Sequence, residues 1–436
     1  MKLLHPEVPF APRRTPFFYG WVVLGASTLG VIMSIPGQTM GVSVFTDPLI
    51  GATGLSRLGL SNAYLAGTLT SGLLLPYGGR LLDRFGSRLT VLGASFGLAL
   101  TLLALSAIDG IAATLTSVVG FVDPGVLVWG SLAVAFTALR FSGQGMLTMV
   151  SRTMLGKWFD RRRGLAAAIS GLFVAFAFAV TPLVLNSWIE MATWRGAWAG
   201  MAAIVAVGMG GFGWLLFRDN PEECGLRMDG AAPEEVAPEE HSATRADALR
   251  APAFWALTLT LAVHGMVITG FTFHITDVGA AVGLSATEAV SLFLPMAVCS
   301  TVTGALVGWV ADRTKIRTLI FVMLGAEMLG YAAAAQLGTS PGFVLAVIGI
   351  GVASGFFSPL ASVGLPRLFG RTHLGAIAGI QSMALVIGSA LGPSAFAASR
   401  TLTGSYTVGL LGCLVLPLGV LVLNAFARHP RDVPPR

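Results

Sequence analysis

The side chain best suited to bind a small anion in this sequence is Arg140, which lies within an apolar run in the segment ALRFSGQG. Gln144 follows it by about one helical turn. A guanidinium forms paired hydrogen bonds with a carboxylate, and a nearby amide adds direction. An arginine at the centre of a bilayer is costly and faces a cavity or a partner. Two roles stay open: direct contact with an anionic substrate, or a structural or proton-coupling role.

Two histidines, His264 and His274, share another apolar run. Histidine titrates near neutral pH, so an intramembrane imidazole can transmit a proton. Ten residues of helix separate the two by about 15 Å along the axis and about 80° around it, so they are not a ligand pair. His264 is the deeper of the two and the better candidate for proton coupling. The alternative is an imidazole that is hydrogen-bonded to a neighbouring Ser or Thr.

Four further polar residues lie within apolar runs. Gln38 follows a Pro-Gly pair, which we expect to interrupt the first run and to expose backbone groups to a cavity. Asn186 and Gln381 complete the predicted set of substrate-binding or coupling residues. Glu327 stands in LGAEMLG, where it is protonated, paired sideways or misplaced by the predicted span boundaries, and no function is assigned to it.

The composition indicates that these residues lie in a membrane. Charged residues make up 11% of the 436-residue chain and the mean hydropathy is +0.78, whereas about a quarter of the residues in a soluble domain are charged. Apolar runs of about 20 residues recur, each long enough to cross roughly 30 Å of hydrocarbon. We predict an all-α membrane protein with twelve spans, with eleven or thirteen as alternatives. The predicted spans are residues 18–45, 60–79, 88–107, 126–150, 164–188, 196–217, 253–278, 288–310, 316–338, 342–366, 374–398 and 406–427.

Loops and linkers give the predicted topology. All but four of the 27 Lys and Arg lie in the tails or in the loops between even-numbered and odd-numbered spans, which predicts cytoplasmic termini. The linker contains AAPEEVAPEEH at 231–241, so we expect it to be mobile except for a short helix near 246–250. We interpret the apolar piece at 111–122 as an interfacial hairpin. The predicted parts are a tail at 1–17, a bundle at 18–217, a linker at 218–252, a bundle at 253–427 and a tail at 428–436.

A charged motif occurs once in each half of the chain, as GGRLLDRFGSR at 78–88 and as GWVADRTKIR at 308–317. This repeat at half the chain length indicates duplication. Its aspartates can pair with cations or cap a neighbouring helix, as expected of a cytoplasmic gate. The alternative is that its arginines only set topology. The second copy departs from the first, because Lys315 stands in place of Gly86. The predicted gate residues are Gly79, Asp83, Arg84, Gly86, Arg88, Asp312, Arg313 and Arg317.

These motifs resemble the signatures of the major facilitator superfamily, and the closer likeness is to bacterial monocarboxylate and oxalate–formate carriers. The matching pieces are YGWVV at 19–23, GKWFDRRRGLAAAISG at 156–171, RDNPEECGLRMDG at 218–230 and FGRTHLGAIAGI at 369–380 with Gly392-Pro393 beyond. The resemblance implies two six-helix bundles related by a pseudo-two-fold axis along the membrane normal, and alternating access. It also implies a bacterial-type plasma (inner) membrane as the location. It implies that Arg140 bonds to carbonyls of the first helix or takes part in proton coupling. Spans 288–310 and 374–398 lack Lys and Arg, which disfavours a dicarboxylate.

Other classes of function fit the sequence less well. No HExxH or Walker motif is present, so we expect no enzyme and no nucleotide-driven pump. The three cysteines are isolated, which disfavours a disulfide framework or a metal site. We therefore predict a monomeric secondary transporter of a small organic solute in a lipid bilayer, most simply an organic anion such as a monocarboxylate with proton coupling, without cofactor or nucleic-acid partner. The alternatives are a drug or neutral-metabolite permease, a transporter-derived sensor and a membrane-embedded enzyme.

Overall fold

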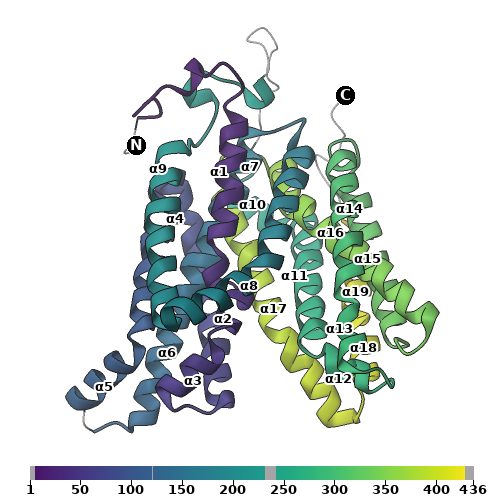
Figure 1. The fold of residues 1–436 in the computed structure, drawn as a ribbon. Helices are drawn as coiled ribbons and strands as arrows, with labels where there is room; N and C mark the ends of the chain where they lie inside the picture. The colour runs from purple at the N-terminus through teal and green to yellow at the C-terminus, as the bar shows by residue number, and fades with distance from the viewer. Residues whose placement is uncertain (1–4, 120, 231–241, 428–436) are drawn as a thin grey trace. The chain divides into compact units, whose positions relative to one another are not determined.

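The computed structural model describes residues 5–119, 121–230 and 242–427, and the regular elements in these ranges are all helices (Figure 1). Ten helices among the described residues are long and apolar enough to cross a membrane. The predicted all-α membrane class is therefore confirmed, while the count of twelve spans stays a prediction. The linker piece at 231–241 and the tail at 428–436 lie outside the described residues.

Two pairs of predicted spans each form two helices that meet at a kink of one non-helical residue. Helix α4 (Arg57–Ser106) has 50 residues, and only Gly86, with a φ of 80°, leaves the helical conformation. Helix α8 (Arg163–Ala203) is interrupted in the same way at Thr193. The charged motif at 78–88, which lies between the predicted spans 60–79 and 88–107, therefore contains the break between two helices, at Gly86. The chain needs only one residue with positive φ to redirect the helix, and glycine adopts that conformation without strain.

The first of two compact units consists of Met1–Trp158, Phe173–Pro233 and Ala378–Ser382. In Figure 1, the start of the described chain lies at one end of this unit, and α3 and α5 lie at the other end. Besides α4 and most of α8, its elements are η1 (Pro12–Arg14), α1 (Gly20–Met33), η2 (Ile35–Gly37), α2 (Thr39–Ser43), α3 (Thr46–Thr53), α5 (Ile108–Val118), α6 (Pro124–Arg140), η3 (Phe141–Leu147), α7 (Thr148–Trp158), η4 (Ile204–Gly211), α9 (Phe212–Leu216), η5 (Glu222–Cys224) and η6 (Met228–Gly230).

The second unit consists of Phe159–Leu172, Glu234–Ile377 and Met383–Arg436. Its first helix confirms the predicted short helix near 246–250, because Thr244 and Asp247 form a reciprocal cap at its start. Its elements, besides the beginning of α8, are α10 (Arg245–Arg250), α11 (Pro252–Phe273), α12 (Ile275–Ala280), α13 (Ala286–Ser291), α14 (Phe293–Ala311), α15 (Ile316–Ala334), α16 (Ser340–Phe369), α17 (Leu374–Thr403), α18 (Tyr406–Cys413) and α19 (Val415–Phe426).

The apolar piece after α4 is a helix and not the expected hairpin. Helix α5 has 11 residues, so it reaches about 16 Å and is too short to span the hydrocarbon core. Asp109 in its first turn pairs with Arg195 at 2.5 Å. A helix satisfies its own backbone groups, which a short hairpin near lipid does not, and this explains why the segment is helical.

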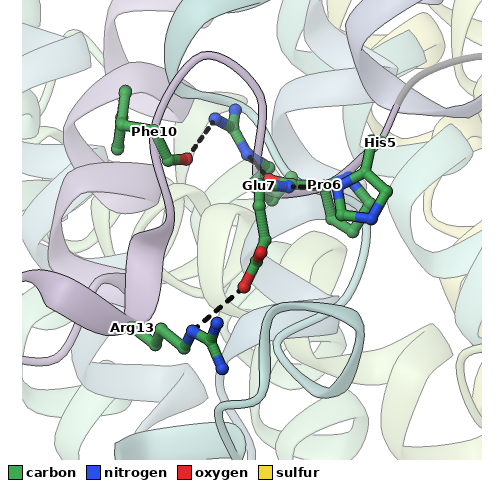
Figure 2. Close-up of polar contacts among 6 residues, drawn as sticks. His5, Pro6, Glu7, Phe10 and Arg13 are labelled. Carbon is green, nitrogen blue, oxygen red and sulfur yellow. Dashed lines mark hydrogen bonds and ion pairs between the residues drawn. The ribbon is translucent and has the colours of Figure 1, made fainter.

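The N-terminal segment, predicted only as a polar tail, is held against the first unit by Arg218. This side chain is 1% exposed, and its guanidinium donates to the carbonyl oxygens of Pro6, Val8 and Phe10. Figure 2 shows this segment, in which Arg13 also pairs with Glu7 at 3.0 Å. A guanidinium has five N–H donors in a planar fork, so one arginine can organise several carbonyl groups. We call residues 5–15 together with Arg218 the N-terminal clasp.

Burial in the N-terminal clasp changes the chemistry of a nearby thiol. Cys224 is 1% exposed, and desolvation raises the pKa of its thiol to about 11, although the neighbouring Arg218 charge acts in the opposite direction. The same desolvation lowers the pKa of Arg218. A thiolate is the reactive form of cysteine, so this thiol is unreactive at neutral pH.

We predict that Arg218→Ala releases residues 5–15 and increases the reactivity of Cys224. Without the buried surroundings the thiol pKa falls toward its ordinary value of about 8.5, so maleimide labelling at pH 7 should be at least tenfold faster. Mass spectrometry of labelled Cys224, on a background with Cys299 and Cys413 replaced by Ser, measures the rate. Arg227→Ala, a nearby arginine substitution, is the control and should leave the rate unchanged. Equal rates in wild type and Arg218→Ala would contradict the clasp.

Candidate functional site

The first unit contains a polar cluster where its first long helix breaks. Helix α1 ends at Met33, α2 begins at Thr39, and η2 connects them. A Cβ atom on Gly37 would lie 2.7 Å from the carbonyl oxygen of Leu139 and 2.8 Å from the Cα of Gly143. Only glycine lets the break approach the backbone of α6 and η3 this closely. The predicted interruption of the first span at residues 36–37 is therefore present, and its position is fixed by backbone contact.

The segment opposite this break is π-helical. Element η3 covers Phe141–Leu147, directly after Arg140, and includes Gln144. A π-helical turn adds a residue to the helix, redirects the following side chains and is frequent at functional sites. Arg140 is the last of the 17 residues of α6, so it lies about 24 Å along the helix from Pro124 and well inside the membrane.

Arg140 is bound to the helix break. Its side chain is 2% exposed, and Nη1 donates to the carbonyl oxygen of Gly37 at 3.1 Å and to the hydroxyl of Thr39 at 3.4 Å. The Tyr64 hydroxyl donates to the same Thr39 oxygen at 3.0 Å, and the guanidinium carbon lies 5.3 Å from the Tyr64 ring centroid. Its Nε has no hydrogen-bond partner in the described part of the chain. The guanidinium thus satisfies a carbonyl that the break frees, and its Nε donor stays available.

Both glutamines near Arg140 belong to the same cluster. Gln38 donates from Nε2 to the hydroxyl of Ser34 at 3.1 Å and approaches that of Thr148 at 3.5 Å. The Gln144 Oε1 is buried and has no partner among the described residues. The structure therefore brings Gln38, Arg140 and Gln144 together in the first unit. We call these three residues, with Ser34, Thr39, Tyr64 and Thr148, the break cluster.

The other two predicted amides are placed differently. Asn186 is exposed on α8, and Gln381 is buried on α17 with its Nε2 lacking a partner among the described residues. Neither has a hydrogen bond to Arg140 in the described part of the chain. Their roles in binding or coupling stay predictions.

His264 lies midway along α11 in the second unit, beside a residue to which the sequence assigned no function. Its Nδ1 is 3.7 Å from the Oε1 of Glu327 on α15, and the two side chains are 5% and 0% exposed. The ring of Phe357 lies 5.7 Å from the imidazole. Nδ1 has no hydrogen-bond partner among the described residues, so the alternative of an imidazole bonded through this nitrogen to Ser or Thr is not what the structure shows. The sequence signal for this contact was the single Glu within the apolar run 316–338.

His274 does not pair with His264, as the spacing predicts. Its own contacts hold neighbouring helices together. Its Nε2 lies 3.0 Å from the carbonyl oxygen of Pro393, its Nδ1 lies 3.4 Å from the hydroxyl of Tyr406, and its ring stacks on Phe396. A carbonyl only accepts, so Nε2 carries the proton and Nδ1 accepts from Tyr406. These contacts join α11, α17 and α18 at one end of the second unit.

The first charged motif is hydrogen-bonded to an aspartate that lies more than 100 residues later in the chain. Asp219 accepts a hydrogen bond from the backbone N–H of Ser87 at 2.6 Å, and so caps the helix that resumes after Gly86. A Cβ atom on Gly86 would lie 2.4 Å from Asp219 Oδ2. Arg88 donates to the Trp214 carbonyl oxygen at 2.7 Å. Gly79, Asp83 and Arg84 lie within α4, a few residues before this break.

The second charged motif caps a different helix. Asp312 accepts a hydrogen bond from the backbone N–H of Gly164 at 2.7 Å, at the start of α8. A carboxylate at a helix N-terminus interacts favourably with the helix dipole. Lys315 is extended, with φ −64° and ψ 136°, so this copy turns without the positive φ that Gly86 supplies. Arg313 and Arg317 lie over the rings of Trp309 and Phe321.

Comparison with known families identifies the type of protein. A sequence model described as Major Facilitator Superfamily matches residues 17–393. The chain belongs to the major facilitator superfamily. As a member, it is a multi-pass membrane transporter and not an enzyme, which confirms both predictions. No curated protein sequence matched the chain significantly.

Solved structures of this superfamily share the fold. The proton:xylose symporter XylE bound to 6-bromo-6-deoxy-D-glucose has a TM-score of 0.69 at 16% identity, over 94% of this chain and 95% of that chain. FucP in the outward conformation gives 0.62 at 12%, over 94% and 99%, and another structure names FucP as the E. coli fucose:proton symporter. The human organic anion transporter MFSD10 gives 0.60 at 14%, over 94% and 100%. At these identities the likeness shows the fold alone.

We predict that Asp312→Asn slows transport by roughly two- to fivefold while membrane insertion stays normal, since a charge at a helix end contributes about 0.3–1 kcal/mol. The same result is expected for Asp83→Asn. Solute uptake per inserted molecule is the measurement. Asp123→Asn is the matched control, because Asp123 caps α6 and lies outside both motifs. Uptake at the wild-type rate by both motif variants would remove the gate assignment.

Proposed function

We propose that the protein is a secondary active transporter that moves a small organic anion, most simply a monocarboxylate, by alternating access with proton coupling. The observation that carries this proposal is the break cluster, in which Arg140 is buried at the interruption of the first long helix. Superfamily membership supports carriage of a small solute. The absence of a Walker motif from the sequence supports a gradient as the energy source.

The unused hydrogen-bonding groups of the break cluster support an anionic solute. The Nε of Arg140 is a charged donor without a partner, and the Oε1 of Gln144 is an acceptor without a partner, both among the described residues. A carboxylate can accept from the guanidinium, and a hydroxyl of the same solute can donate to the amide. One positive charge suits a monoanion better than a dianion.

A neutral solute is the second candidate, and a specific observation favours it. Arg140 is 2% exposed and its Nη1 already donates to the Gly37 carbonyl, which is the structural role left open by the sequence. On this view the solute binds to amides and hydroxyls, and the guanidinium holds the helix break in place. The names of the structural neighbours include carriers of sugars and of organic anions, so the fold accommodates both classes.

The topology belongs to the same proposal. Twelve spans form bundles at 18–217 and 253–427, joined by the linker at 218–252, and the two charged motifs act as a cytoplasmic gate. The distribution of Lys and Arg supports cytoplasmic termini, and the likeness to bacterial carriers supports a bacterial-type inner membrane. The likeness to monocarboxylate and oxalate–formate carriers in the pieces at 156–171 and 369–380 supports the substrate class. We expect the transporter to act as a monomer.

Uptake into proteoliposomes tests the function. A panel of labelled monocarboxylates, dicarboxylates and neutral sugars is offered with and without an imposed proton gradient. We expect accumulation of a monocarboxylate that depends on the gradient. Accumulation of a sugar instead would favour the second candidate, and no accumulation of any solute under either condition would contradict the proposal.

We predict that Arg140→Gln raises the KM for the anion by about 10- to 100-fold, because a hydrogen bond to a charged group contributes roughly 1.5–3 kcal/mol. Arg140→Lys should recover part of this loss, because it keeps the charge without the fork. The ratio of anion KM to neutral-solute KM, measured in each variant, shows whether Arg140 contacts the substrate or only holds the helix break in place. A structural Arg140 would lower the melting temperature and slow all solutes alike.

A further inference from the structure

The second unit encloses a group of polar atoms that have no hydrogen-bond partner in the described part of the chain. They are Nδ1 of His264, both carboxyl oxygens of Glu327 and the hydroxyl of Tyr331. These three residues are 4%, 0% and 1% exposed. We call them the carboxyl–imidazole cluster. Buried polar groups in proteins are nearly always paired, so several orphaned atoms in one place require an explanation.

Close helix packing seals the cluster. Helices α15 and α16 touch through their backbones, because a Cβ atom on Gly330 would lie 2.5 Å from the backbone nitrogen of Ile350. Gly330 lies three residues after Glu327, so this contact closes the helix surface beside the carboxyl group. The ring of Phe271 packs on Tyr331 at 5.7 Å, and Phe357 covers the imidazole. The carboxyl group therefore has no water contact in this conformation.

Few other titratable or charged groups of the described residues lie near the Glu327 carboxyl group. On α11 the facing titratable group is His264, on α15 it is Tyr331, and at the end of α18 it is Cys413. Helix α19 contains no titratable residue. On α16 the charged residue is Arg367, which donates to the carbonyl oxygens of Ala311 and Thr314 beside the second charged motif. His264 is therefore the group that can offset a negative charge on Glu327.

The cost of burying charge determines how many protons the pair holds. An isolated ionised carboxylate in an apolar interior costs many kcal/mol, so such a group neutralises or finds a counter-charge. With one proton the pair has no net charge, whether the proton sits on Glu327 or on His264. Without that proton the net charge is −1, and with a second proton it is +1. The sealed conformation therefore retains one proton, and its release requires water or a new partner.

We propose that Glu327 and His264 together form the binding site for the coupling proton. The proton adds to a Glu327 oxygen or to Nδ1 of His264 while the cluster is exposed to water, and it is held when the helices close. It leaves unchanged in the other open state, so one proton crosses in each cycle. This assignment rests on the proposed function of a proton-coupled carrier. It places proton binding in the second unit, whereas Arg140 and the break cluster belong to the first.

The first test separates proton-driven accumulation from simple exchange of solute. Glu327→Gln keeps the size of the side chain and imitates its protonated form. We expect proton-driven accumulation to fall at least about tenfold, while exchange of solute across equal concentrations stays within about twofold of wild type. Glu190→Gln makes the same change at an exposed position, and it should leave both rates unchanged. Accumulation at the wild-type level by Glu327→Gln would overturn the proposal.

Two further variants separate proton binding from packing. Tyr331→Phe removes a hydroxyl but no proton carrier that acts near neutral pH, so accumulation should persist. His264→Gln removes the second proton carrier, and we expect the pH dependence of uptake to shift, because Glu327 then binds the proton alone. An unchanged pH profile in His264→Gln would limit the site to Glu327 and overturn the shared-proton assignment.

Infrared spectroscopy tests the site without any solute. The purified protein in lipid should show the absorption of a buried protonated carboxyl group that disappears in Glu327→Gln and stays in Glu190→Gln. If Glu327→Gln does not fold, Glu327→Asp should shift this band. A band that neither variant alters would overturn the site. If no solute is accumulated but the band behaves as expected, the proposed function fails and the proton site stands.

Discussion

The loss of water from hydrogen-bonding groups inside the membrane is the constraint on which this structure depends. Where the first long helix breaks, the freed Gly37 carbonyl is satisfied by Arg140 rather than by solvent, and Arg140 in turn is tolerable there only because the break supplies acceptors. The same constraint acts in the second unit, where Glu327 has no solvent and depends on His264. Both clusters lie well inside the apolar spans, where an unpaired charge is least stable.

Helix ends near the two charged motifs show a second regularity. Asp219 and Asp312 each accept from a backbone N–H at the start of a helical segment, at Ser87 and at Gly164. In each case the aspartate comes from a part of the sequence far from the helix that it caps. Caps of this type hold together elements that are distant in sequence, and they depend on charge and geometry rather than on apolar packing.

Hydropathy and rare residue types were enough to predict the class of protein and one polar site. Low charge and long apolar runs indicate membrane helices, and an arginine within such a run indicates a buried polar site. The sequence did not predict the π-helical turn at Phe141–Leu147, the cap that Asp219 forms at Ser87 or the contact between His264 and Glu327. These features depend on which residues of distant helices meet. Propensity and periodicity describe one helix at a time, so they do not contain that information.

The bond between Asp219 and Ser87 has a mechanical consequence. Asp219 directly follows Arg218, the anchor of the N-terminal clasp, and both stand at the beginning of the segment that continues toward the second half of the sequence. A displacement of Asp219 therefore acts directly on the bend at Gly86, through this one hydrogen bond. The connecting peptide is thus more than a passive tether, because Asp219, near its start, is bonded to the place where α4 changes direction.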